Sequence, residues 1–162
     1  DDPAFSAKVF KVIRETGIAP DMLELEITES AAMKNPAAAL RQITPLRKAG
    51  VRLSLDDFGT GHSSLASLTQ MPFDVFKIDR QFVMGIGEDE QAEAVVDTIL
   101  GLARTLNFEV VAEGIENVRQ EAFLRKRGCT LGQGYLYGKP MALPQFLEMA
   151  HGASPRALRA VS

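Results

Sequence analysis

Short apolar segments alternate with longer amphipathic segments along this chain. The apolar segments have the length and the bounding turn residues of β-strands. The amphipathic segments repeat apolar residues every three to four positions, which is typical of α-helices. The predicted strands cover residues 23–28, 51–57, 75–79, 109–113 and 130–135, and the predicted helices cover residues 4–16, 36–49, 89–106, 118–127 and 144–150. This alternation predicts an α/β fold with a parallel sheet.

Residues at the ends of the predicted helices support these boundaries. Gly17 follows the first helix, where glycine commonly adopts the left-handed backbone that ends a helix. Asn35 precedes a proline at the start of the next helix, and both residue types are favoured there. Asn117, with Gln120 three residues later, predicts a capping box at the start of the helix that covers residues 118–127.

The positions of the polar residues favour a barrel over an open sheet. A dinucleotide-binding open sheet would carry a glycine-rich turn after its first strand, and this sequence has none there. Polar residues instead follow each strand in turn, as in (β/α) barrel enzymes, which take roughly 250 residues. The 162-residue chain is therefore expected to form a partial TIM-like (β/α) barrel of about five parallel strands, lacking the N-terminal strands. We assign residues 1–150 to the C-terminal part of this one barrel and residues 151–162 to a tail or the start of a linker.

Composition excludes several classes of protein. Hydrophobic residues make up 46% of the chain and charged residues 24%, which is ordinary for a globular domain. The net charge of −3 and the lack of a basic stretch argue against a nucleic-acid polymer as partner, and no apolar run is long enough to span a membrane. Cys129 is the single cysteine and fits a reducing compartment. We expect a cytoplasmic domain, which leaves open an inner-membrane anchor elsewhere in a longer protein.

Charged and polar side chains lie near the end of each predicted strand. Side chains alternate between the two faces of a strand, so residues two apart share a face. If the polar faces point into the barrel, five of these side chains converge at one mouth. They are Glu26, Asp56, Lys77, Glu113 and Gln133.

The carboxylates in this group indicate a metal site. Glu26, Asp56, Asp57 and Glu113 can share one dry site only if cations neutralise them. Oxygen ligands favour Mg²⁺ or Mn²⁺ over zinc. The adjacent aspartates suit two ions about 3.5–4 Å apart, and Lys77 could hold a phosphate oxygen or the attacking water. Each acid taken alone is more often a solvated carboxylate, but their recurrence at successive strand ends favours the metal site.

Five segments carry a recognisable pattern. They read EITES at 26–30, DDFGTGHSSL at 56–65, KID at 77–79, VAEGIE at 111–116, and QGY at 133–135 followed by Lys139 and Pro140. In this order and spacing, from about residue 3 to residue 140, they resemble the EAL-domain family of bacterial cyclic di-GMP phosphodiesterases. The resemblance implies hydrolysis of cyclic di-GMP to linear 5′-pGpG with two Mg²⁺ or Mn²⁺ ions, and Ca²⁺ is expected to bind but to inhibit.

The resemblance also implies roles for individual residues. Glu26 and Asp56 would hold one metal, and Asp56, Asp57 and Glu113 would hold the second. Lys77 would contact the nucleophilic water, with Glu113 as the candidate general base. The residues implied in substrate binding are Asp79, Gln133 and Pro140.

Two further acids are expected to support the site. Glu29 would brace the segment 57–65, which the family uses for metal binding and for dimerisation, so a homodimer through this region is expected. Glu116 is a family position whose expected role is support. His62 replaces the tyrosine that is common in this segment, and we interpret it as a loop variant.

Alternatives to an active enzyme remain. A catalytically silent cyclic di-GMP receptor or dimerisation module would keep the pocket, but such proteins typically lose metal residues that this sequence retains. A metal-dependent enolisation barrel would not explain the segment 56–65. The glutamate of the Glu-Ala-Leu motif and a metal-binding asparagine of the family have no counterpart in the chain, so the 162 residues alone are expected to be inactive. Sensory or GGDEF domains can be fused to such a domain in a full protein.

Overall fold

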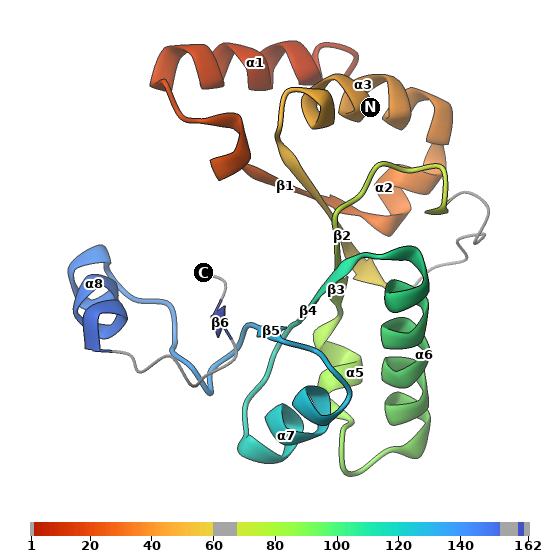
Figure 1. The fold of residues 1–162 in the computed structure, drawn as a ribbon, viewed down its shortest axis with the longest axis vertical. Helices are drawn as coiled ribbons and strands as arrows, with labels where there is room; N and C mark the ends of the chain where they lie inside the picture. Colours follow the sequence, from red (N-terminus) through yellow and green to blue (C-terminus); the bar gives the residue numbers. More distant parts are fainter. Residues whose placement is uncertain (1, 60–67, 153–158, 161–162) are drawn as a thin grey trace. The chain divides into compact units, whose positions relative to one another are not determined.

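The computed structural model describes residues 2–59, 68–152 and 159–160, and in these residues six strands form one sheet. Hydrogen-bonded neighbours follow the order of the chain, β1-β2-β3-β4-β5-β6, as Figure 1 shows. The pairs β1–β2, β4–β5 and β5–β6 are parallel. The strands are β1 Glu24–Thr28, β2 Arg52–Phe58, β3 Val75–Ile78, β4 Glu109–Ala112, β5 Leu131–Gly132 and β6 Arg159–Ala160. The predicted α/β fold with parallel strands is confirmed.

Helices connect most of these strands (Figure 1). They are α1 Phe5–Thr16, the 3₁₀ turn η1 Pro20–Met22, α2 Glu29–Lys34, α3 Pro36–Lys48, α5 Arg80–Met84, α6 Glu90–Leu106, α7 Val118–Lys126 and α8 Leu143–Gly152. The five predicted helices are present, with ends shifted by one or two residues. The sequence did not predict α2 and α5, which have only six and five residues, or the two-residue strand β6.

The predicted helix ends have the expected geometry. Gly17 has a φ of 70° and its N–H donates to the carbonyl of Ile13, which ends α1. The Asn35 side chain accepts a hydrogen bond from an N–H of the first turn of α3. Asn117 and Gln120 form the reciprocal capping box of α7. Each of the two asparagine N-caps stabilises its helix by about 1 kcal/mol.

The described residues separate into two compact units. The first unit comprises Asp1–Lys77 with Ala103–Glu109, and the second comprises Ile78–Leu102 with Val110–Ser162. In the first unit the rings of Phe58, Phe76 and Phe108 stack in series, with centroids 4.8 and 4.4 Å apart. β2 contributes buried leucines to the same core, whereas β1 alternates exposed polar positions with half-buried apolar ones. This alternation follows the predicted period of two.

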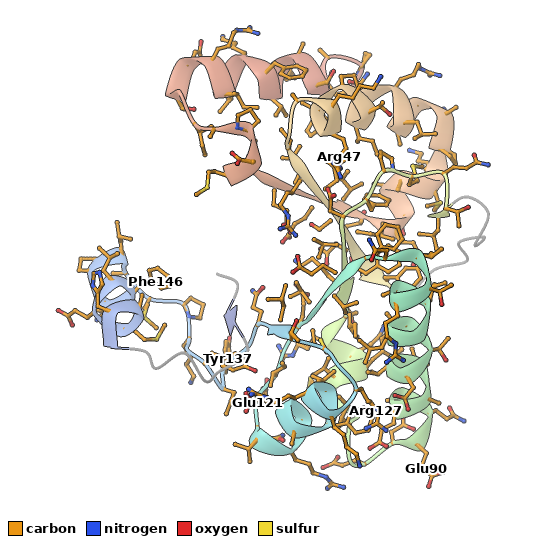
Figure 2. All side chains as sticks on the ribbon, in the orientation of Figure 1. Arg47, Glu90, Glu121, Arg127, Tyr137 and Phe146 are labelled. Atoms are coloured by element: carbon orange, nitrogen blue, oxygen red, sulfur yellow. The ribbon has the colours of Figure 1, made fainter. Side chains whose placement is uncertain are left out.

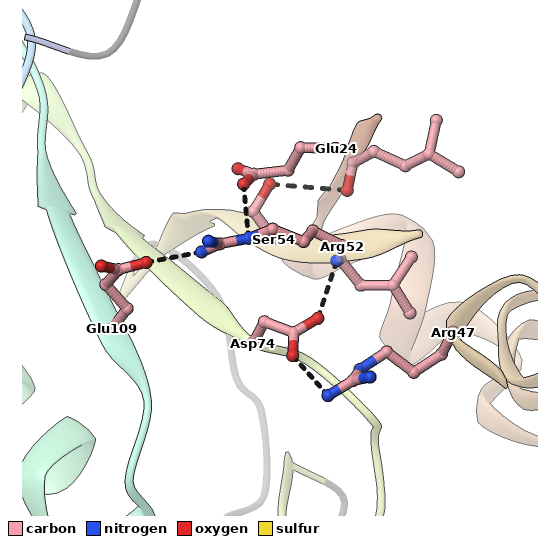
Figure 3. Close-up of polar contacts among 8 residues, drawn as sticks. Glu24, Arg47, Arg52, Ser54, Asp74 and Glu109 are labelled. Atoms are coloured by element: carbon pink, nitrogen blue, oxygen red, sulfur yellow. Dashed lines mark hydrogen bonds and ion pairs between the residues drawn. The ribbon is translucent and has the colours of Figure 1, made fainter. Parts of the chain in front are cut away.

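Ion pairs join the starting ends of the strands in the first unit, as Figure 3 shows. Arg52 pairs with Glu24 of β1 and with Glu109 of β4. We call these three residues the strand-start network. The hydrogen bond from Arg52 to Glu109 raises the pKa of the guanidinium. Asp74, just before β3, accepts the N–H of Leu53 at 3.0 Å and pairs with an arginine of α3 (Figure 3).

In the second unit, β4 and β5 continue into hydrogen-bonded segments. The Gln133 N–H donates to the carbonyl of Ala112 at 2.8 Å, and the Gln133 carbonyl accepts from the N–H of Ile115 at 3.0 Å. Gly134 lies so close to this segment that a Cβ would come within 2.1 Å of the Ile115 carbonyl oxygen. Only glycine fits there. Arg127, labelled in Figure 2, pairs from the end of α7 with a carboxylate of α6.

Candidate active site

The structure brings together three of the predicted site residues at the ends of β1, β2 and β3. The ammonium nitrogen of Lys77 lies 2.6 Å from Glu26 Oε1 and 3.7 Å from Asp56 Oδ1. In the β1–β2 register, Glu26 pairs with Ser54 and Thr28 pairs with Asp56. Asp56 therefore lies two residues further along the strands than Glu26, on the same face of the sheet. Their side chains share a face, as the alternation along each strand predicts.

Lys77 is the most buried of the three side chains in this contact. The side chain of Lys77 is 7% exposed, that of Asp56 22% and that of Glu26 53%. An ammonium group that loses this much hydration is costly to bury unless carboxylates stay close to it. The two acids supply that compensation from neighbouring strands.

The backbone at Asp57 departs from a regular strand. Its φ is 56°, and its N–H donates to Asp56 Oδ1 at 3.0 Å. Aspartate is one of the few residues other than glycine that tolerate this left-handed region. In a regular strand the carboxylates of Asp56 and Asp57 would point to opposite faces, and the left-handed turn releases them from that constraint. The sequence signal for such a turn is weak, because it consists only of an aspartate followed two residues later by Gly59, which also has a positive φ.

Glu29 is buried at the start of α2. It is 3% exposed, and its Oε2 accepts the N–H of Gly59 at 3.1 Å. The contact joins Glu29 to residue 59 of the segment 57–65, and the bracing role of Glu29 stays a prediction. The rest of that segment, including His62, lies outside the described residues, as does the dimer contact predicted there.

Glu113 and Gln133 lie at the ends of adjacent strands in the second unit. Glu113 directly follows β4, and its N–H donates to the carbonyl of Ile78 at 3.1 Å. Gln133 directly follows β5. Asp79 has a structural role that the sequence reading missed, because its Oδ1 accepts the N–H of Gln81 at 2.8 Å and so caps α5.

Glu116 acts on the residues around Glu113. Its carboxylate lies 3.0 Å from Arg80, and its N–H donates to the Gln120 side chain at 2.8 Å. The Arg80 side chain in turn covers Gly114, where a Cβ would come within 2.3 Å of Arg80 Cγ. Glu116 therefore contacts the arginine that packs on the turn after Glu113, and its supporting role in the site stays a prediction.

Pro140 lines a largely apolar pocket in the second unit. The pocket has a volume of about 520 Å³ and is formed by the segment after β5 and by α8. Tyr137 and Phe146, labelled in Figure 2, line it together with Gln133. Burial raises the pKa of the Tyr137 phenol. The sequence analysis named Gln133, Tyr135 and Pro140 but not Tyr137 or Phe146.

The donor set around Lys77 fits a hard divalent cation in chemistry. Glu26 and Asp56 present carboxylate oxygens to one positive charge, and Mg²⁺ and Mn²⁺ prefer such ligands. Across residues 2–59, 68–152 and 159–160, however, no three or more His, Cys, Asp or Glu side chains form a ready metal-binding group. Within the predicted set of four acids, Glu26 and Asp56 both contact Lys77.

The same part of the chain contains no helix that is both long enough and apolar enough to cross a membrane.

Fold and site together define a class of protein. Charged side chains at the C-terminal ends of consecutive parallel strands are the arrangement that (β/α) barrel enzymes use for their active sites. The EAL domain model matches residues 1–140. The chain belongs to the EAL domain family.

Known proteins share both sequence and fold with this chain. The cyclic di-GMP phosphodiesterase NbdA of Pseudomonas aeruginosa is 43% identical over 144 residues, covering 87% of this chain and 18% of NbdA. The structure of the PaMucR phosphodiesterase in complex with c-di-GMP superposes with a TM-score of 0.84 at 39% identity, covering 90% of this chain and 62% of that one. Klebsiella pneumoniae BlrP1, solved with cyclic di-GMP and either calcium or manganese, gives a TM-score of 0.76 at 30% identity, covering 83% of this chain and 34% of BlrP1.

These neighbours are EAL domains with a TIM-like barrel, and this chain corresponds to part of such a barrel. The chain spans 18% of the length of NbdA and 38% of the length of the cyclic di-GMP phosphodiesterase RocR of Pseudomonas aeruginosa.

Proposed function

We propose that the complete barrel to which this chain contributes hydrolyses cyclic di-GMP to linear 5′-pGpG in bacterial second-messenger signalling. The observation that carries the proposal is the contact of Lys77 with Glu26 and Asp56 at the ends of three successive strands, in a chain of the EAL family. Its relatives NbdA, RocR and PdeR are named as cyclic di-GMP phosphodiesterases, which supports the substrate.

Four acids of the chain would hold two Mg²⁺ or Mn²⁺ ions. Glu26 and Asp56 would ligate one ion, and Asp56, Asp57 and Glu113 would ligate the second. Bound ions of this kind lower the pKa of water and neutralise charge that develops on a phosphate. The left-handed backbone at Asp57 supports this assignment, because it frees the two adjacent carboxylates from pointing to opposite faces.

The other site residues would position the reactants. Glu113 would accept a proton from the attacking water as the water oxygen bonds to phosphorus. The bond between phosphorus and the 3′ oxygen of the neighbouring ribose would break, and that oxygen would take a proton from solvent. Lys77 would hold that water or a phosphate oxygen as a fixed positive charge. Gln133 and Pro140 would contact the dinucleotide, and Asp79 would do so from its position as the cap of α5.

Assembly of the site would extend beyond the described residues. We propose a homodimer through residues 57–65, with Glu29 holding the start of this segment through Gly59. Further sensory or GGDEF domains in the full protein would supply the input signal, and the reaction would take place in the cytoplasm. Because the 162 residues form only part of a barrel, they would be inactive by themselves.

Hydrolysis by the complete domain tests this function. Cyclic di-GMP would be incubated with Mg²⁺, Mn²⁺ or Ca²⁺, and pGpG would be quantified by chromatography. We expect turnover with Mg²⁺ or Mn²⁺, none in excess EDTA, and inhibition by Ca²⁺, which tolerates looser coordination geometry. Glu113→Gln should abolish most of the activity, whereas Glu88→Gln, which removes an exposed carboxylate after α5, should not. Turnover in excess EDTA would contradict the metal-dependent mechanism.

A cyclic di-GMP receptor without catalysis is the second candidate. It would bind the dinucleotide in the pocket lined by Gln133 and Pro140 without hydrolysing it. Binding of cyclic di-GMP by the complete domain in Mn²⁺, with no pGpG formed, would establish this alternative.

A further inference from the structure

Lys77 places a positive charge between two carboxylates that the proposed function assigns to a divalent ion. Its nitrogen lies 2.6 Å from Glu26 Oε1 and 3.7 Å from Asp56 Oδ1, and the lysine side chain is 7% exposed. At these distances the ammonium group already neutralises part of the negative charge of the pair. It does so from a fixed strand, β3, rather than from solvent.

A divalent ion and this ammonium group would compete for the same oxygen atoms. Mg²⁺ binds carboxylate oxygens at about 2.0–2.1 Å and requires nearly ideal octahedral geometry. An ammonium group in hydrogen-bond contact with one of those oxygens repels the entering ion and occupies a lone pair that the ion needs. Glu26 is the ligand that can move, because its side chain is 53% exposed, whereas that of Asp56 is 22% exposed.

We propose that Lys77 is the internal counter-cation of Glu26 and Asp56 in the metal-free enzyme, and that the first divalent ion must displace it from Glu26. This inference rests on the proposed function, because it uses the metal ligands assigned there. Metal entry then releases the ammonium group from Glu26, which makes it available for a phosphate oxygen or water. The coupling is reciprocal, so whatever holds Lys77 on Glu26 weakens metal binding to the same extent.

The direction in which metal affinity changes when Lys77 is removed distinguishes this role from a purely catalytic one. A lysine that serves only the reaction leaves metal affinity unchanged when it is removed, or lowers affinity if it helps to shape the site. A competing counter-cation raises metal affinity when it is removed. Activity cannot make this distinction, because it falls in both cases.

The test is calorimetric titration of the full-length protein with Mn²⁺ alone, without dinucleotide. Lys77→Met removes the charge, and Lys77→Gln removes it but retains a hydrogen-bond donor. We expect both variants to bind the first Mn²⁺ at least about tenfold more tightly than the wild type, because a unit charge at hydrogen-bond distance in a partly buried site is lost. Lys8→Met removes a charge from an exposed lysine of α1 and should change the affinity by no more than about twofold.

The possible results distinguish this inference from the proposed function. A wild-type protein that binds no Mn²⁺ and hydrolyses no cyclic di-GMP contradicts the proposed function. A wild-type protein that does both, beside Lys77 variants with equal or weaker Mn²⁺ affinity, overturns the counter-cation role alone. If both variants unfold without metal, thermal unfolding followed by circular dichroism should show that Mn²⁺ restores the fold, since the ion replaces the lost charge. Failure of Mn²⁺ to restore it also overturns the role.

Discussion

Asp57 allows the chemical role of a side chain to be separated from the backbone conformation that it supports. Its φ of 56° lies in the left-handed region, which asparagine tolerates as well as aspartate does. Asp57→Asn therefore removes a carboxylate without straining the backbone. We expect the stability of the complete domain to change by no more than about 0.5 kcal/mol. We expect the rate of cyclic di-GMP hydrolysis to fall by at least about 10²-fold, the scale of losing a positioned group in an active site.

Asp57→Ala adds a backbone penalty to the same chemical loss. Alanine gains no local hydrogen bond in the left-handed region, and its Cβ is crowded there, which costs about 1 kcal/mol. Asn107 provides a matched control, because it is the other described residue besides glycine with a positive φ, at 60°, and it has no assigned role in the site. Asn107→Ala should lose about the same 1 kcal/mol and retain the wild-type rate.

Urea denaturation gives the unfolding free energy of all three variants, and the chromatographic assay gives their rates of cyclic di-GMP hydrolysis. In a domain of roughly 250 residues, 1 kcal/mol corresponds to a fall in Tm of about 2–4 °C. A wild-type rate in Asp57→Asn would refute the metal-ligand assignment. Equal stability of the asparagine and alanine variants at position 57 would refute the argument from backbone strain.

Three further predictions follow from buried or paired groups. Glu29→Gln weakens the hold on the segment 57–65, so half-maximal activity should require about 10–100-fold more Mn²⁺, and an unchanged Mn²⁺ dependence would exclude the bracing role. Arg52→Met breaks the strand-start network and should cost about 1 kcal/mol in urea unfolding. Arg125→Met breaks the pair with Glu121, one turn earlier in α7, and should cost about 0.3–0.5 kcal/mol. Equal losses would show that the network adds nothing to its single pairs. Burial raises the pKa of the Cys129 thiol to about 11, above its unfolded value near 8.5. The stability that the neutral thiol contributes is therefore present below about pH 8.5 and is lost as the pH rises through about 11. The unfolding free energy of the wild type should therefore fall relative to that of Cys129→Ala across this window, and a constant difference would contradict the shift.

The parts of the fold that the sequence predicts well are those with a repeated pattern. The alternation in Leu25 and Ile27 gives β1 its face, and the capping box of Asn117 and Gln120 starts α7 at the predicted residue. The short helices α2 and α5 were missed because five or six residues contain too few turns to show a helical period. Their actual signal is a single polar residue at the end of the preceding strand, such as Thr28, which caps α2.

The sequence predicts which side chains of the candidate site share a face, but not which of them contact each other. Parity places Glu26, Asp56 and Lys77 on one face, and the structure joins these three. Nothing in the sequence shows that Lys77 lies closer to Glu26 than to Asp56, because that depends on strand register and side-chain conformation. The positive φ of Asp57 was equally hidden, since aspartate adopts ordinary backbone conformations far more often than left-handed ones.

Polar residues at strand ends have two kinds of role in this fold, and the groups that they contact distinguish the two. A parallel strand is followed closely by a helix, so the residue between them often serves as the helix cap. Thr28 and Asp79 accept backbone N–H groups two or three residues ahead, which is a local contact that any such turn requires. Glu26 and Lys77 instead contact each other from positions 51 residues apart in the chain. Capping explains the first pair without reference to a substrate. No local requirement of the backbone explains a buried lysine beside two acids on separate strands, so that contact is the feature of the described chain that most requires a function.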